Sequence, residues 1–279
     1  MKLRQTAAWV GISATALLAT TACGAETVKR AAETVDRSDA ILAALTRATD
    51  RTEELGSAEI EMTADTGDGP VTMEGTYSWG NGYAYDIEMD AGAAGMGELT
   101  DDPTIHALFV DGAYYYNVDP LTSGPYKGKE WLKVDGSVVF GEKGSQAFSG
   151  GDSGVSPATS MRSLKYAKGF EDLGEERVDG RTAAHYRALL GKEQMGRFRD
   201  AYSGEGSVLD SVTGGADKVT MDVWVGADDL PIRLRQKMGA MTITMDFEKF
   251  GATAEVKAPP AGETADVTEV LRENLEQRG

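Results

Sequence analysis

Two short segments carry side chains that could form a nucleophilic catalytic site. Ser153 lies in the sequence Gly-Asp-Ser-Gly at 151–154, and His185 ends the sequence Thr-Ala-Ala-His at 182–185. A serine hydroxyl that is activated by a histidine base attacks carbonyl carbon atoms, which is the chemistry of acyl transfer and proteolysis. Ser153, however, lies in a stretch rich in glycine and serine at 141–156, where such a tetrapeptide arises easily by chance.

The order of these two segments also argues against catalysis. They resemble the serine and histidine signatures of chymotrypsin-type proteases, in which the histidine precedes the aspartate and the serine and is usually followed by cysteine. Here Ser153 precedes His185, and Tyr186 follows the histidine. We therefore expect that neither Ser153 nor His185 does covalent chemistry, that the protein is not an enzyme, and that His185 makes a structural hydrogen bond in a strand.

The composition excludes several further classes of site and partner. With one cysteine and two histidines, the sequence lacks the ligand spacings of zinc sites and the cysteine pairs of disulfide scaffolds. No glycine-rich phosphate-binding pattern occurs between a strand and a helix, so we expect neither a metal nor a cofactor. The formal net charge of −17, from 28 Lys+Arg against 45 Asp+Glu, repels nucleic-acid phosphates. We therefore expect no nucleic-acid partner.

The lone cysteine, Cys23, follows a segment typical of a secretory signal. Residues 1–22 begin with two basic residues, continue through an uncharged stretch and end in Ala-Thr-Thr-Ala. The junction resembles the lipobox of bacterial lipoproteins, although Thr20 stands where that motif usually has leucine. The resemblance implies that cleavage leaves Cys23 as an N-terminus acylated with fatty acids such as palmitate. An ordinary secreted protein that is cut at the same place is the alternative.

The chain is predicted to divide into three segments. Residues 1–22 form the signal peptide, 23–37 form a polar lipidated tether, and 38–279 form a single domain. Ser38 is expected to cap an amphipathic helix that ends at Gly56. No shift in composition near the midpoint of the chain indicates a second domain.

After this helix, the hydrophobic pattern changes from a helical period to a period of two. Alternating runs are separated by turn sequences such as Asp111-Gly112 and Asp179-Gly180, which favour hairpins. Further helices are expected from Pro157, over 192–202 and over 264–277. The predicted fold class is therefore α+β: a curved antiparallel sheet, or half-barrel, of about 10–11 strands with helices covering its concave apolar face.

The apolar face of this sheet is the candidate binding site. Residues at a period of two share one side of a sheet whatever the strand pairing, so the inward set is predictable. That face is rich in methionine, whose flexible side chain suits irregular or varied apolar partners. A dry packed core has the same pattern, so the choice between core and cavity stays open. The predicted pocket wall consists of Met62, Met73, Tyr85, Met89, Met221, Val223, Ile232, Leu234, Met241, Ile243 and Met245.

Two stretches, Gly174–Tyr186 and Val223–Arg233, resemble the signatures of the LppX/LprG-type lipoproteins of actinobacteria, which are relatives of the LolA/LolB lipoprotein carriers. The order of the predicted elements also fits this family. The resemblance implies a curved sheet with a pocket for acyl chains beneath its helices. It further implies a non-catalytic lipoprotein on the outer, extracytoplasmic face of the cell membrane. Acylated Cys23 would hold it there while it binds or carries a lipid or a lipid-linked glycan.

A second class of function stays open. The same fold could serve as an envelope sensor or protein-interaction module without a bound lipid, and an envelope protein would then be its partner. The matching stretches favour the fold more than either function, because Asp179-Gly180 and Asp229-Leu230-Pro231 are turn sequences.

Overall fold

The structure is a computed structural model of the 279-residue chain. It describes residues 22–67, 69–80, 82–120, 122–139, 141, 156–164, 167, 169–191, 218–251 and 253–277. The chain forms two compact units, Met1–Ala40 and Ile41–Gly279. All of the named strands and the candidate site belong to the second unit.

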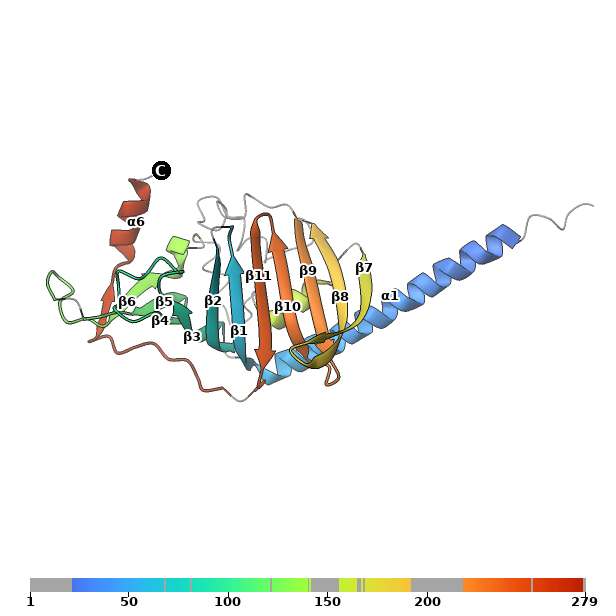
Figure 1. The fold of residues 1–279 in the computed structure, drawn as a ribbon, viewed down its shortest axis with the longest axis horizontal. Coiled ribbons are helices and arrows are strands. Elements are labelled where there is room, and N and C mark those ends of the chain that lie inside the picture. The colour runs from blue at the N-terminus through green and yellow to red at the C-terminus, as the bar shows by residue number, and fades with distance from the viewer. Residues whose placement is uncertain are drawn as a thin grey trace, which may run out of the picture. The chain divides into compact units, whose positions relative to one another are not determined.

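One open sheet of twelve strands forms the second unit (Figure 1). The strand order is β12-β6-β5-β4-β3-β2-β1-β11-β10-β9-β8-β7, so β12 and β7 are its edges. Neighbouring strands are antiparallel, except that β12 runs parallel to β6. The strands are β1 (Ser57–Asp65), β2 (Pro70–Ser78), β3 (Ala84–Asp90), β4 (Thr104–Val110), β5 (Ala113–Asn117), β6 (Trp131–Asp135), β7 (Phe170–Val178), β8 (Arg181–Gly191), β9 (Lys218–Gly226), β10 (Pro231–Met238), β11 (Met241–Glu248) and β12 (Thr264–Asp266).

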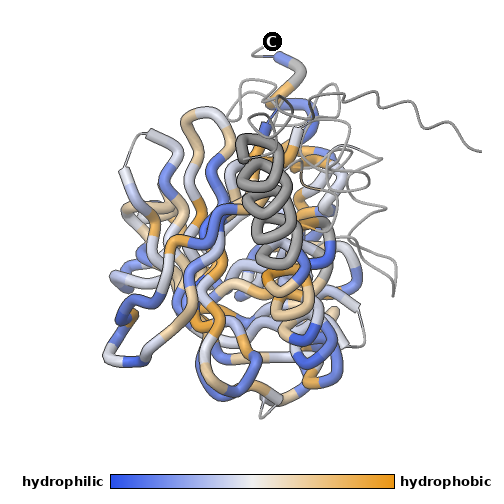
Figure 2. Tube along the Cα trace, turned by 90° about the vertical axis from the view of Figure 1, so that its right-hand side faces the viewer, coloured by the Kyte–Doolittle hydropathy of each residue, from blue (hydrophilic) through white to orange (hydrophobic). Residues whose placement is uncertain are grey.

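Alternating residues and turn chemistry account for these strands. Figure 2 shows hydrophobic and hydrophilic residues following one another along the strands. Asp111 and Asp179 have φ angles of 54° and 49°, and the glycines that follow them have φ angles of 77° and 78°. Two successive positive φ angles are typical of the type I′ turn, whose twist matches that of a hairpin. The two predicted hairpin turns are therefore confirmed.

The sheet has two chemically different faces. We call the side that carries Glu61 and Glu74 the outer face, and the side that carries Met62 and Met73 the inner face. Two helices cover part of the inner face: α1 (Ala22–Leu55), through its residues from Ile41 onward, and α3 (Pro157–Ser163). The predicted α+β fold, with a curved sheet and helices on its apolar face, is confirmed.

Hydrogen bonds hold α1 and α3 to the strands beneath them. The indole Nε1 of Trp79 donates to the backbone oxygen of Thr52 at 3.0 Å, and both residues are buried. The amide of Gln236 donates to the Ser160 hydroxyl of α3 at 3.2 Å. Gly56 ends α1 with a φ of 69°, a conformation that glycine adopts without strain. These contacts fix the helices against the inner face.

The first predicted helix differs from the structure at its start. Helix α1 begins at Ala22 and runs through Ser38, so Ser38 is not its N-cap. The residues after Gly24 include many alanine, glutamate, lysine and arginine residues and no proline, so nothing ends the helix there. The predicted helix over 192–202 lies outside the described residues.

The predicted C-terminal helix over 264–277 is wrong at its start. Residues Thr264–Asp266 form β12, which pairs with Trp131–Lys133 of β6, and the helix α6 covers Thr268–Glu276. The backbone groups of β6 provide hydrogen-bond partners that a local pattern does not reveal, and this pairing adds a strand at the edge of the sheet. No helix in the described part of the chain is both long and apolar enough to cross a membrane.

Candidate functional site

Four predicted residues form a row of methionines across the inner face. Met245, Met62, Met73 and Met89 lie directly opposite one another on the adjacent strands β11, β1, β2 and β3. Directly opposed side chains on one face have Cβ atoms about 4.5–5.5 Å apart, so these side chains are neighbours. The structure therefore brings together residues that are up to 183 positions apart in the sequence.

Helices cover one end of the predicted wall completely. Five of its residues have at most 9% of their surface exposed and belong to a hydrophobic cluster that includes Ile41 and Leu45 of α1 and Met161 of α3. Val223 is fully buried, at 0% exposed. These residues form part of a packed core beneath the two helices. The five residues are Met221, Val223, Leu234, Met241 and Met245.

The middle of the inner face differs from the end that the helices cover, because apolar side chains in the middle are only partly buried. We call these residues the inner junction, since each of them packs against at least one of three neighbouring hydrophobic clusters. Tyr85 packs against all three clusters, and Met89 is buried in the third, beside Ile87 and Ile105. The inner junction consists of Met62, Met73, Tyr83, Tyr85, Tyr116 and Ile243.

Tyrosine side chains surround Tyr85 at this junction. Its ring centroid lies 6.2 Å from that of Tyr83 and 6.3 Å from that of Tyr114. Burial raises the pKa of the Tyr85 phenol well above 10, and neighbouring tyrosines raise it further. Burial likewise raises the pKa of Tyr116 to about 12. Sequence reasoning named Tyr85 but missed Tyr83, which lies two residues before it, and Tyr116, which ends a run of three tyrosines that hides the alternation.

Ile232 is the one predicted wall residue that the structure places on the outer face. The register of β10 against β9 shifts between Pro231 and Arg233, so Ile232 does not continue the alternation of Leu234. Its side chain packs instead in a cluster with Trp224. A bulge of this kind turns a residue to the other side of a sheet, which the period of two does not reveal.

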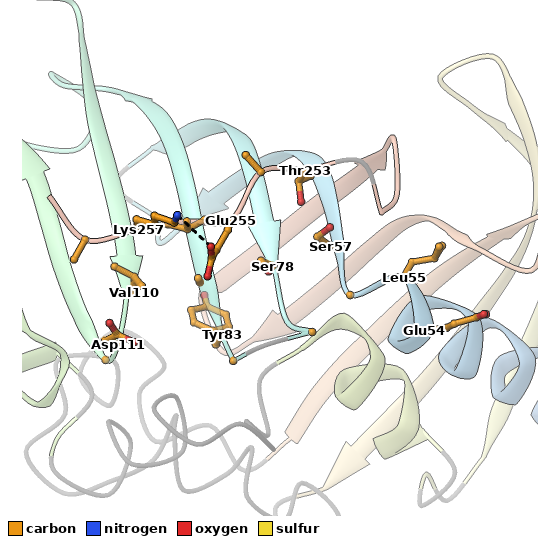
Figure 3. Close-up of a pocket in the computed structure, with 18 residues that line it drawn as sticks. Glu54, Leu55, Ser57, Ser78, Tyr83, Val110, Asp111, Thr253, Glu255 and Lys257 are labelled. Carbon is orange, nitrogen blue, oxygen red and sulfur yellow. Dashed lines mark ion pairs between the residues drawn. The ribbon is translucent and has the colours of Figure 1, made fainter.

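Two pockets of the described part of the chain lie away from most of the predicted wall. A pocket of about 710 Å3 is lined by the end of α1, by Gly80 and residues 82–84, by the 110–112 turn and by the segment 253–258 (Figure 3). Its lining is polar, with Glu255 and Lys257 forming an ion pair at 3.4 Å. None of the eleven predicted residues lines it. A smaller pocket of about 200 Å3 lies between α1 and α3, beside Leu42, Leu45 and Met161.

The outer face holds a buried ionic cluster around Asp222, which is 3% exposed. Its carboxylate accepts hydrogen bonds from Arg187 at 2.7 Å and Arg235 at 3.2 Å, and it lies 2.9 Å from Nε2 of His185. Burial by itself raises the pKa of Asp222, but these hydrogen bonds outweigh it and lower the pKa below its ordinary value. The aromatic ring of Trp224 stacks on His185 with centroids 4.1 Å apart.

This cluster explains the histidine that the sequence singled out. His185 makes a hydrogen bond within β8 and β9, as predicted, and its other ring nitrogen lies 3.3 Å from Glu176. Ser153 lies outside the described residues. Within the described residues, no group of three or more histidine, cysteine, aspartate or glutamate side chains could hold a metal ion.

Two proteins of Streptomyces are similar in sequence to most of this chain. The chain is 22% identical to an uncharacterized 31.2 kDa protein of Streptomyces griseus over 255 residues, which cover 83% of this chain and 81% of the relative. It is also 22% identical over 226 residues to a predicted lipoprotein of Streptomyces coelicolor, covering 77% and 71%. No family model matches the chain.

A solved structure shares the fold of this chain. The crystal structure of the lipoprotein LppX from Mycobacterium tuberculosis matches with a TM-score of 0.51 at 14% identity, covering 78% of this chain and 99% of LppX. The open sheet with helices on its inner face is thus shared between the two proteins. The chain therefore has the fold of the LppX/LprG-type lipoproteins, and the resemblance that its sequence showed is confirmed.

Proposed function

We propose that this protein is an envelope lipoprotein that binds a hydrophobic ligand with acyl chains on the inner face of its sheet, without catalysing a reaction. The observation that carries the proposal is the inner junction. Its apolar side chains lie in the middle of the sheet, beside two clusters of buried residues, and are nevertheless partly exposed. Apolar surface of this kind marks binding sites in soluble proteins.

The methionine row supports an acyl chain as the ligand. Met62 and Met73 are partly exposed neighbours within it, and methionine side chains adapt to flexible apolar partners. The ligand is then a lipid or a lipid-linked glycan. Acyl chains on Cys23 would hold the protein on the outer face of the cell membrane, where such ligands are available.

A protein partner is the second candidate, and helix α6 is the observation in its favour. Three apolar residues of this short helix are exposed: Val270 at 48%, Leu271 at 37% and Leu275 at 41%. An exposed apolar helix face fits a protein groove as well as it fits a lipid surface. The two candidates place the ligand on different elements, so one set of variants separates them.

The test is the lipid content of the protein purified from a Streptomyces host. The full chain is expressed with its leader, extracted with organic solvent, and the extract is analysed by mass spectrometry. We expect the wild type to carry a lipid and Met62→Arg to lose it, because a charge in an apolar site must be desolvated. Glu61→Arg is the matched control, since Glu61 is the exposed neighbour on the outer face.

The same measurement can also contradict the proposal. A folded wild type that carries no lipid from this host would favour the protein-binding function. In that case Leu271→Glu on α6 should abolish capture of a partner, whereas Met62→Arg should not. If Met62→Arg and Glu61→Arg lost equal amounts of lipid, the inner face would not be the lipid-binding site.

A further inference from the structure

Five tyrosines converge on one part of the inner face. Tyr77 on β2 lies directly opposite Tyr85 on β3, and Phe109 and Tyr114 continue this row on β4 and β5. The rings of Tyr77 and Tyr83 are 5.2 Å apart, edge to face. The rings of Tyr114 and Tyr116 are stacked in parallel at 6.1 Å. We call Tyr77, Tyr83, Tyr85, Tyr114 and Tyr116 the tyrosine cluster.

The electrostatics of Tyr85 show that the phenol groups are close together. After burial, the largest causes that raise its pKa are the four other tyrosines of the cluster. A buried phenol with a raised pKa keeps its proton at neutral pH and remains a hydrogen-bond donor. Tyr85 thus offers a neutral donor, and no lysine or arginine of the described residues is among the largest influences on its pKa.

The position of Tyr85 makes its hydroxyl available to a ligand. Its side chain is partly exposed although protein surrounds it closely enough to raise its pKa. No described residue accepts or donates a side-chain hydrogen bond to Tyr85 or Tyr116. Both hydroxyls are therefore polar groups inside an apolar face, a pattern typical of the few polar groups that orient a ligand in an apolar site.

We propose that the tyrosine cluster is a polar subsite in which Tyr85 and Tyr116 donate hydrogen bonds to an uncharged oxygen of the ligand, such as an ester carbonyl or a hydroxyl. This inference rests on the proposed function and deepens it. Tyr77 is four residues from Met73 along β2, and Tyr85 is four residues from Met89 along β3. At the usual rise of a strand, this spacing is about 14 Å. When an oxygen of the ligand binds at the tyrosine cluster, the acyl chain of the same ligand can extend to the methionine row.

The neutral character of Tyr85 and Tyr116 predicts selectivity between lipids. An anionic headgroup beside these neutral phenols would be desolvated without a cation from the described residues among the main influences on Tyr85, whereas a neutral ester or hydroxyl keeps its hydrogen bonds. The structure therefore favours uncharged over anionic lipids that carry the same acyl chains.

The test compares two probes that differ in charge. Full-length protein, stripped of lipid, is titrated with dioleoylglycerol and with dioleoylphosphatidic acid, each delivered from detergent micelles. We expect tighter binding of dioleoylglycerol by the wild type. Tyr85→Phe and Tyr116→Phe, which remove only a hydroxyl, should each weaken that binding about five- to tenfold, as loss of one hydrogen bond does. Neither variant should weaken binding of hexadecane, which has no oxygen.

Tyr115→Phe is the matched control. Tyr115 lies between Tyr114 and Tyr116 on β5 but is buried on the outer face, against Leu108 and Val110. We expect it to bind dioleoylglycerol as the wild type does. Circular dichroism melting checks that each variant is folded.

Two results would overturn the inference alone. One is wild-type affinity for dioleoylglycerol in both Tyr85→Phe and Tyr116→Phe; the other is equal or tighter binding of dioleoylphosphatidic acid by the wild type. In both cases the protein still binds lipid, so the proposed function stands. A wild type that binds none of the three probes would refute the proposed function as well.

Discussion

Tryptophan substitutions at two positions of one row should separate packed core from binding surface. Val223 and Met62 belong to the same row across the inner face, in which Leu234 and Met245 lie between them. Val223 is 0% exposed and packed beneath the helices, whereas Met62 is partly exposed at the inner junction. The same large side chain is therefore added once to a full site and once to a site with room.

The expected cost follows from this difference in packing. Overpacking a filled core destabilises a protein by about 1–3 kcal/mol, so Val223→Trp should lower Tm by about 2–12 °C in a domain of this size. Met62→Trp should shift Tm by less than about 2 °C, as substitutions at incompletely buried positions do. It should instead reduce the lipid that co-purifies with the protein by at least about twofold, by occupying the space of the acyl chain.

Calorimetry and mass spectrometry of the same preparations provide both readouts, with Glu61→Trp on the outer face as the control. The opposite pattern would refute the reasoning. If Val223→Trp melted like the wild type and lost its lipid, Val223 would line a cavity and the helices would not pack on it. If Val223→Trp and Met62→Trp were both strongly destabilised and both kept the lipid, the inner junction would be core.

Three further predictions concern other parts of the chain. Cys23→Ser should move the protein from the membrane fraction to the medium on immunoblots, and unchanged membrane association would contradict acylation. A fluorophosphonate probe should not label the protein; labelling that disappears in Ser153→Ala would show a nucleophilic serine. Because hydrogen bonds lower the folded-state pKa of Asp222, its carboxylate stabilises the fold above the unfolded pKa of about 3.9, and this contribution is lost as the pH falls through the folded value. Asp222→Asn should cost about 3 kcal/mol at pH 7 and flatten the acid limb of a plot of Tm against pH.

The outer face shows where sequence reasoning reached its limit. Alternation assigns Asp222 to the polar side of β9, and polar residues on an exposed sheet face are normally solvated. The structure buries it instead, because Arg187 and Arg235 from the two adjacent strands cover its carboxylate. These arginines face Asp222 directly across β8 and β10, and that pairing depends on the strand order. A single strand pattern therefore indicated the face but not the burial.

Local periodicity does not predict a structural feature correctly where a segment distant in the sequence determines it. The start of α6 was misplaced because β6, which lies far earlier in the chain, takes Thr264–Asp266 as a parallel neighbour. Ile232 was misplaced because a register shift between β9 and β10 breaks the alternation at one residue. In both cases the controlling interaction is a backbone pairing between segments that local periodicity does not connect.

The sequence by itself determined which residues share the inner face, since a period of two fixes the side of nearly every residue in a strand. It also determined the hairpin turns, because consecutive positive φ angles require Asp-Gly or similar pairs. Only the tertiary structure decided that Val223 is core and that Met62 is partly exposed. That difference depends on where α1 and α3 lie over the sheet, and an apolar residue has the same sequence pattern whether a helix or a ligand covers it.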